Sequence, residues 1–269
     1  MALFASAVMV GGAAAASVSA FYYYWWGAPS STVFGKPLDK VATVPAGEEE
    51  EGLSLVLQQL FAALRKTGLT AEGLFRQPGS RAQVQQLRAT IDAGQAVQLE
   101  AVEDPYLIAD LLKLYLRELP EPLFPHSSCQ QFLQVETSFR QTKDEETWLK
   151  ETRALLTGLP LANRVTLRHL FSFLEEVAQV PSNRMDSTNL AIVFAPNLIY
   201  LAEASHSEVL LATPLFINLV QKCIEHCHRL FTGLAEDCEL LSPSQLRRQS
   251  ASSDTAADDL EDDWQNSDT

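Results

Sequence analysis

The chain has 269 residues, 46% of them hydrophobic, so it is long enough to bury a sizeable core and most of it should fold. Its formal net charge of −14 argues against a nucleic-acid-binding protein, which normally carries a basic footprint. The four cysteines, at positions 129, 223, 227 and 238, form no framework of a small secreted domain and indicate a reducing compartment.

The N-terminal segment 1–26 contains no charged side chain and ends in the aromatic run FYYYWW. Its length fits a membrane-spanning helix, and the aromatic run fits the headgroup interface. Lys36 and Lys40 follow it, which predicts a cytoplasmic chain tethered to the cytosolic face of a membrane. Two alternatives stay open. Residues 18–20 resemble a signal-peptidase site without the basic n-region, and the Ala-rich stretch need not insert at all.

Residues 27–52 contain Gly, Pro, Ser and an acidic run, and are expected to form an extended lead-in. Apolar residues then recur at helical spacing from Leu53 to Leu64, which predicts a helix that Gly68 ends. A loop is expected at 69–79.

A second helix is predicted from Ser80, with Gln83 completing a capping box, to Gly94. A third runs from an Asp-Pro start at 104–105 to about Glu118. No region alternates as strands do, so the predicted fold is all-α, a single helical-bundle domain. Further helices are predicted at 129–141, 144–157, 162–178, 186–194 and 213–231.

The acidic tail 240–269 loses the apolar period and is predicted to be disordered, with Ser250 in a run that looks like a kinase target. Cys223 and Cys227, with histidines beside them, suggest a metal site only at first sight. They fall in one predicted helix, and no second ligand pair appears at zinc-finger spacing. We therefore expect no metal.

The loop 72–80, EGLFRQPGS, is the most informative segment. Its two apolar residues can pin the loop to the core, while Gly73 and Gly79 permit tight turns, so the guanidinium of Arg76 is expected to point outward on a semi-rigid support. Such a group can stabilise charge on a transferring phosphoryl group. A plain surface arginine beside a helix N-cap is the alternative. The chain has no P-loop, no Gly-x-Ser-x-Gly and no His-Glu-x-x-His, so it is not expected to be a self-contained enzyme.

Two more segments accompany this loop. The third predicted helix belongs to DPYLIADLLKLYLRELPEPL and places Lys113 and Arg117 four residues apart on one face. In 189–198, NLAIVFAPNL, a hydrophobic helix is expected to end at Pro196 and to leave Asn197 at a helix end. An alternative for these polar residues is that they only cap and brace the bundle.

Together and in this order, the three blocks resemble the GTPase-activating domain of the RhoGAP family, over about 33–231. The resemblance implies an arginine finger at Arg76 that reaches the GTP phosphates of a bound Rho-family small GTPase. It implies no cofactor of the chain's own, because GTP and Mg²⁺ belong to the partner.

The resemblance also assigns roles to other residues. Lys113 and Arg117 match cations that hold the finger loop and meet the GTPase switch regions. Asn197 matches an asparagine that hydrogen-bonds at the switch surface, and Asn189 and the neighbouring Pro196 belong to the same motif, for which a structural role is expected.

The chain departs from the family pattern at three positions. Ala195 stands where glycine is common, Tyr106 where histidine is frequent and Arg184 where lysine is common. Ala195 is expected to crowd Asn197, which leaves two hypotheses. The chain either activates a GTPase, or binds one as a catalytically weak scaffold.

Overall fold

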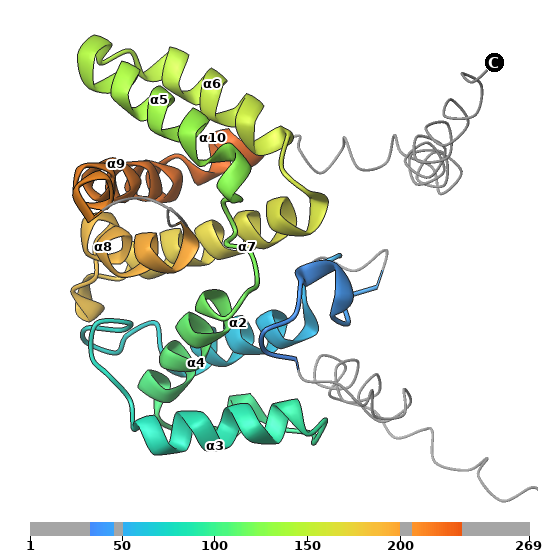
Figure 1. Ribbon diagram of the computed structural model, residues 1–269. Coiled ribbons are helices and arrows are strands. Elements are labelled where there is room, and N and C mark those ends of the chain that lie inside the picture. Colours follow the sequence, from blue (N-terminus) through green and yellow to red (C-terminus); the bar gives the residue numbers. More distant parts are fainter. Residues whose placement is uncertain (1–32, 46–50, 200–205, 233–269) are drawn as a thin grey trace, which may run out of the picture. The chain divides into compact units, whose positions relative to one another are not determined.

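The computed structural model describes residues 33–45, 51–199 and 206–232 (Figure 1). Residues 1–26, 240–269 and Ser250 lie outside the described residues, so the membrane anchor, the disordered tail and the kinase site stay predictions. Within the described residues the secondary structure is helical, apart from one isolated bridge between Thr43 and Ser54. The prediction of an all-α fold is confirmed.

The chain divides into two compact units, Met1–Cys227 and His228–Thr269, and everything below concerns the first unless stated. In the second, the Thr232 amide donates to the His228 carbonyl. The α-helices, labelled as in Figure 1, are α2 Leu55–Thr67, α3 Arg81–Asp92, α4 Pro105–Arg117, α5 His126–Thr142, α6 Glu145–Thr157, α7 Leu161–Ala178, α8 Ser187–Leu198, α9 His206–Glu225 and α10 Cys227–Phe231. Three short 3₁₀ turns are η1 Leu38–Lys40, η2 Leu99–Ala101 and η3 Pro181–Asn183.

Helix α4 is the most deeply embedded element near the candidate site. Eight of its 13 residues are buried, and it packs against α2, α3 and α8. Its start is the predicted one, because the Asp104 side chain accepts a hydrogen bond from the Tyr106 amide and Pro105 occupies the first turn. Polar side chains that project from α4 are therefore held on a fixed support.

Residues 33–45, within the range expected to be an extended lead-in, pack onto these helices. The backbone amides of Val33 and Phe34 both donate to the Asp92 carboxylate at the end of α3. The Phe34 ring is buried and meets the Tyr115 ring edge-on, with centroids 5.5 Å apart. This segment joins α3 to α4.

Helices α8 and α9 lie side by side, and α9 also packs on α5 and α7 (Figure 1). Of the described helices, the segment Ser207–Glu225 in α9 is long and apolar enough to cross a membrane by length and composition. Its packing against three other helices accounts for that composition, because a core helix must be apolar where it meets its neighbours.

Several predicted helix limits were wrong, two of them at prolines. The helix predicted at 213–231 is divided, because α9 ends at Glu225 and α10 begins at Cys227, and α5 begins at His126, three residues before the predicted start. Helix α8 continues through Pro196 to Leu198, although the sequence predicted an end before it. Helix α9 begins at His206, seven residues before the predicted start, and contains Pro214. The predicted capping box at Ser80 is also wrong, because no side-chain hydrogen bond caps α3.

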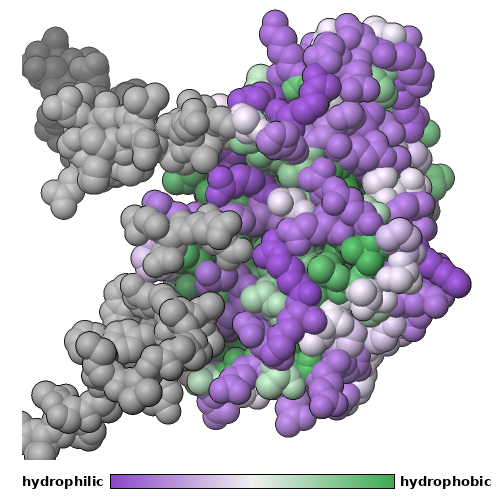
Figure 2. Space-filling view, turned by 180° about the vertical axis from the view of Figure 1, so that it is seen from behind, coloured by the Kyte–Doolittle hydropathy of each residue, from purple (hydrophilic) through white to green (hydrophobic). Residues whose placement is uncertain are grey.

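The surface is largely hydrophilic in the view of Figure 2, with hydrophobic side chains in small groups among polar ones. Among the described residues, the large apolar side chains that are exposed are Leu161, Ile192, Val209, Leu210 and Leu211. Exposed apolar residues are ordinary for a folded domain, and neither the isolated Leu161 and Ile192 nor the short run 209–211 by itself assigns a function.

Candidate functional site

The loop between α2 and α3 turns tightly at its centre. The amides of Arg76 and Gln77 both donate to the Gly73 carbonyl, each at 2.9 Å. Gly73 adopts a φ of 71°, which glycine reaches without a steric penalty. Phe75 has a φ of 70°, which is uncommon for a bulky residue and typically costs about 1–3 kcal/mol. The backbone just before Arg76 is therefore strained, and other contacts must hold it.

Aromatic packing provides one such contact. The Phe75 side chain is 1% exposed, and its ring meets the Phe194 ring of α8 edge-on, with centroids 4.8 Å apart. A second edge-on contact, at 6.3 Å, joins it to Phe173 of α7. Because edge-to-face pairs are favourable, the ring is fixed in the core. Arg76 next to it is exposed, as the sequence predicted.

Lys113 holds the same stretch from α4. Its ammonium donates to the Phe75 carbonyl at 2.7 Å and pairs with Asp110 at 2.8 Å. The Lys113 side chain is only 16% exposed, so solvent screens these contacts weakly. Lys113 thus fixes the peptide that leads directly into Arg76.

Gly79 closes the loop against α4. A Cβ at this position would lie 2.9 Å from the Leu107 amide nitrogen and 3.0 Å from a backbone carbon of Tyr106. Only glycine permits this approach without movement, and it brings the Gly79 amide to within 2.7 Å of the Asp110 carboxylate. Gly79 is required for close packing rather than for an unusual φ.

Glu72 gathers three contacts at the start of the loop. Its carbonyl accepts hydrogen bonds from the Tyr106 hydroxyl and from the side-chain amide of Gln77, both at 2.9 Å. Its carboxylate pairs with Arg184 at 2.9 Å on an exposed surface. Two of the positions that depart from the family pattern, Tyr106 and Arg184, therefore both support the loop.

Asn183 ties the loop to the turn before α8. Its backbone carbonyl accepts from the Gly73 amide at 2.7 Å. Its side-chain amide donates to the carbonyls of Leu69 and Val177, both at 2.8 Å, and its side-chain oxygen accepts from the Met185 amide. The Asn183 side chain is buried and satisfied. The sequence did not single out Asn183, because Leu69 and Gly73, the loop residues that it holds, are distant in the chain.

The remaining predicted residues lie on α4 and α8. Arg117 is exposed at the end of α4, one turn beyond Lys113. Among the described residues, no hydrogen bond or ion pair occupies the guanidinium of Arg117 or of Arg76, so both are available to a partner. Asn197 is largely buried in the last turn of α8, and its side-chain Nδ2 donates to the Val193 carbonyl at 2.7 Å.

Asn189 and Pro196 lie on the same helix. The backbone amide of Asn189 donates to the capping Asp186 carboxylate at 2.7 Å, while its side chain is half-buried. Pro196 is exposed, whereas Ala195 is 2% exposed. Residues two apart on a helix do not face each other. Ala195 therefore does not crowd Asn197 as expected.

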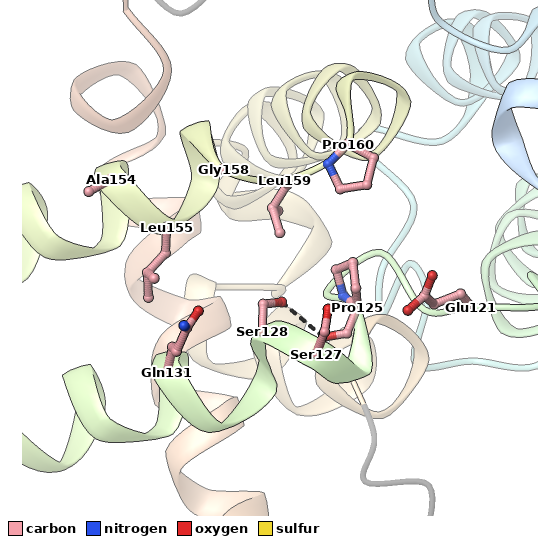
Figure 3. A pocket seen from close by; sticks show the side chains of 10 residues that line it. All are labelled: Glu121, Pro125, Ser127, Ser128, Gln131, Ala154, Leu155, Gly158, Leu159 and Pro160. Carbon is pink, nitrogen blue, oxygen red and sulfur yellow. Dashed lines mark hydrogen bonds between the residues drawn. The ribbon is translucent and has the colours of Figure 1, made fainter. Parts of the chain in front are cut away.

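Figure 3 shows a separate cavity of about 300 Å³ between the start of α5 and the end of α6. Its lining includes Glu121, Ser128, Leu155 and Pro160, and none of the predicted site residues. The candidate site is therefore an exposed surface built on a loop and two helices, as expected for a group that acts on another protein.

The described cysteines show the chemistry of buried thiols. Cys223 is fully buried, and burial raises its pKa well above the usual value. Burial also raises the pKa of the Cys227 thiol to about 12. No group of three or more potential ligands that could hold a metal ion occurs in the part of the chain that the structure describes.

Comparisons with known proteins agree with this geometry. The sequence model of the RhoGAP domain family matches residues 54–203 of this chain. Over 207 residues, the chain is 40% identical to the Rho GTPase-activating protein gacY of Dictyostelium discoideum, covering 76% of this chain and 28% of that protein. It is 32% identical over 200 residues to Rho GTPase-activating protein 24 of Mus musculus, covering 74% and 26%.

A solved structure shows the same fold. The crystal structure of human Rho GTPase activating protein 15 superposes with a TM-score of 0.66 and 27% identity, covering 75% of this chain and 93% of that one. The chain spans just over a quarter of the length of the relatives named above. Since the matched model covers more than half of its residues and the blocks around Arg76, Lys113 and Asn197 fall inside that match, the chain belongs to the RhoGAP domain family.

Proposed function

We propose that the chain stimulates GTP hydrolysis on a Rho-family small GTPase in its GTP-bound form and so switches off its signalling. Arg76 supplies a catalytic guanidinium in trans, while GTP and Mg²⁺ belong to the partner. One observation carries the proposal. Among the described residues, the Arg76 guanidinium is exposed and unpaired, while the backbone that bears it is fixed from several sides.

The physical basis is preorganisation. In phosphoryl transfer, negative charge spreads over the γ-phosphate oxygens, and a guanidinium placed against them lowers the barrier. A side chain already held in position loses little freedom when it acts. The Phe75 ring in the core and the Lys113 hydrogen bond give Arg76 such a base.

The other residues have supporting roles in the proposal. Lys113 holds the loop, and Arg117, exposed on the same face of α4, contacts the partner's switch regions. Asn197 donates or accepts at the switch surface beside the exposed Pro196, and Asn189 secures the start of α8.

A single-turnover assay tests this function. Purified Rho-type GTPases are loaded with GTP and mixed with the full chain, and phosphate release is followed. Arg76→Ala should reduce the stimulated rate by roughly 10³–10⁵, the range known for arginine fingers, while binding to the GTP-loaded protein is largely kept.

The matched control is Arg81→Ala. Arg81 is another exposed arginine, at the first position of α3, and its loss should leave the stimulated rate unchanged. If Arg76→Ala stimulates as well as the parent, Arg76 is not the finger. If the parent binds the GTPases but stimulates none of them, the chain is a binding scaffold instead.

A further inference from the structure

Asp110 is an acidic residue in the middle of a buried helix. Its neighbours in α4, Ala109 and Leu111, are fully buried, whereas the Asp110 side chain is 22% exposed. Both of its carboxylate oxygens are engaged. Oδ2 accepts from the Gly79 amide at 2.7 Å, and Oδ1 pairs with the Lys113 ammonium at 2.8 Å.

The two donors hold the loop on opposite sides of Arg76. Gly79 is three residues after it and marks the end of the loop. Lys113 donates to the carbonyl of Phe75, the residue just before it, at 2.7 Å. The Asp110 carboxylate therefore connects the backbone before Arg76, at Phe75, with the backbone after it, at Gly79.

This link matters because the loop does not hold its shape alone. Phe75 has a φ of 70°, which a bulky side chain rarely adopts. A strained residue persists only where its surroundings over-determine it. The Lys113 hydrogen bond to the Phe75 carbonyl is one such constraint, and Asp110 orients the ammonium that makes it.

We propose that Asp110 is a positioning residue for Arg76. It acts through Lys113 on one side of the finger and through the Gly79 amide on the other, and it fixes the conformation in which the guanidinium faces the GTPase. The inference rests on the proposed function and adds to it a residue that touches neither the nucleotide nor the reacting atoms.

The chemistry of the site requires a carboxylate. Both partners are donors, so the group between them must present two acceptor oxygens. An asparagine has the same shape but only one oxygen, and its NH₂ group would face either the Gly79 amide or the Lys113 ammonium. Asp110→Asn therefore breaks one of the two contacts and removes the negative charge without changing volume.

The test measures maximal rate and half-saturation separately. The full chain and Asp110→Asn are titrated in single-turnover assays against the GTP-loaded Rho-type GTPase that the parent stimulates best. We expect the maximal stimulated rate to fall about tenfold, because a small misplacement of a catalytic group is costly. The concentration for half-maximal stimulation should stay within about twofold, since the docking surface is unchanged.

Glu118→Gln is the matched control. Glu118, at the end of α4, pairs with Arg88 of α3 at 2.9 Å through a half-buried carboxylate, and within the described residues its side chain makes no hydrogen bond or ion pair with the loop. It should keep the parent's maximal rate. A merely structural loss of an ion pair made by a half-buried carboxylate of this helix would affect both variants alike.

A double-mutant cycle tests the route through Lys113. In a Lys113→Met background, Asp110→Asn should lower the maximal rate by less than about threefold, because its target is already missing. An undiminished tenfold effect would contradict the route. If Asp110→Asn alone retains the parent's maximal rate, the inference is wrong while the proposed function stands. If the parent itself stimulates no GTPase, it is the proposed function that fails.

Folding of the variants is checked by thermal melting. Should Asp110→Asn fail to fold, Asp110→Glu answers the same question, because it keeps the charge but moves the carboxylate by one methylene. A lowered maximal rate with unchanged half-saturation supports the inference, and a parent-like maximal rate overturns it.

Discussion

Two glycines illustrate how local surroundings decide what a residue must be. At Gly79 a Cβ would meet backbone atoms of α4 at 2.9–3.0 Å, which no side-chain adjustment can relieve. At Gly158, the C-cap of α6, the nearest atom would be 3.4 Å away, and the backbone is in the ordinary right-handed region. The same substitution should therefore have opposite consequences at these positions.

We expect Gly79→Ala to lower the free energy of unfolding by about 1–3 kcal/mol, as overpacking does. It should also reduce the maximal stimulated rate about tenfold, because the loop must move away from α4. Gly158→Ala should keep the rate and change stability by less than about 1 kcal/mol, in the stabilising direction. Urea titration and single-turnover assays measure both. Equal effects of the two substitutions would contradict this view.

Residue-level prediction from sequence succeeded where the information is local. The apolar pair before Arg76 indicated which side chains are buried, and Gly73 marked a turn. It missed Asp110, whose partner Gly79 is 31 residues away, and the strained φ of Phe75, which depends on Lys113, 38 residues away. An acidic residue three positions before Lys113 in an apolar helix was the available signal for Asp110.

At the scale of elements, prolines account for two of the wrong helix limits, the end of α8 and the start of α9. A proline inside a helix removes one hydrogen bond and clashes with the preceding turn, at a typical cost of about 3 kcal/mol, so the sequence favoured ends near Pro196 and Pro214. Helices α8 and α9 pack along each other, and that tertiary contact outweighs the local penalty. The apolar periodicity of the sequence located the helices, but it carries no information on which helices pack against each other.

A histidine on helix α7 should make the stability of the fold depend on pH. His169 lies on this helix, half-buried, with its ring Nε2 3.0 Å from the Arg168 guanidinium. Burial, and then the charges of Arg168 and Arg65, lower the pKa of His169 from 6.5 to about 4. Between these values the unfolded chain binds the proton and the folded chain does not, so the free energy of unfolding falls as pH drops through this window.

The shift corresponds to at most about 3 kcal/mol lost between pH 6.5 and 4. Urea unfolding at pH 7 and pH 4.5 should therefore show a smaller acid destabilisation for His169→Gln than for the parent. His228→Gln, which alters an exposed histidine, is the control and should leave the difference unchanged. An identical acid loss in parent and His169→Gln would rule out this explanation.

At the scale of the molecule, three sequence blocks were enough to identify the family and the all-α fold, because each block combines apolar periodicity with polar residues at fixed places. The α-helices from α2 to α8 lie within residues 54–203, which match the RhoGAP domain family. The segment 1–26 lies outside the described residues, and its membrane role is a separate prediction that the domain does not require.

Removing residues 2–26 separates the two roles. Against a GTPase in solution, the shortened chain should stimulate as well as the full chain, since the residues proposed for the site all lie between positions 72 and 197. Against a prenylated GTPase on lipid vesicles, the full chain should be active at concentrations at least about a hundredfold lower, because tethering raises the effective concentration. Equal activity on vesicles, measured by phosphate release, would show that the segment is no anchor.

The Phe75 ring has one further consequence, because it belongs both to the hydrophobic core and to the support of Arg76. A substitution at Phe173 or Phe194 would shift the Phe75 ring even where it is too mild to unfold the domain. Variants altered in the interior should therefore lose activity while they remain soluble and well folded. In a genetic screen, some inactivating substitutions would then map to positions that no partner can reach.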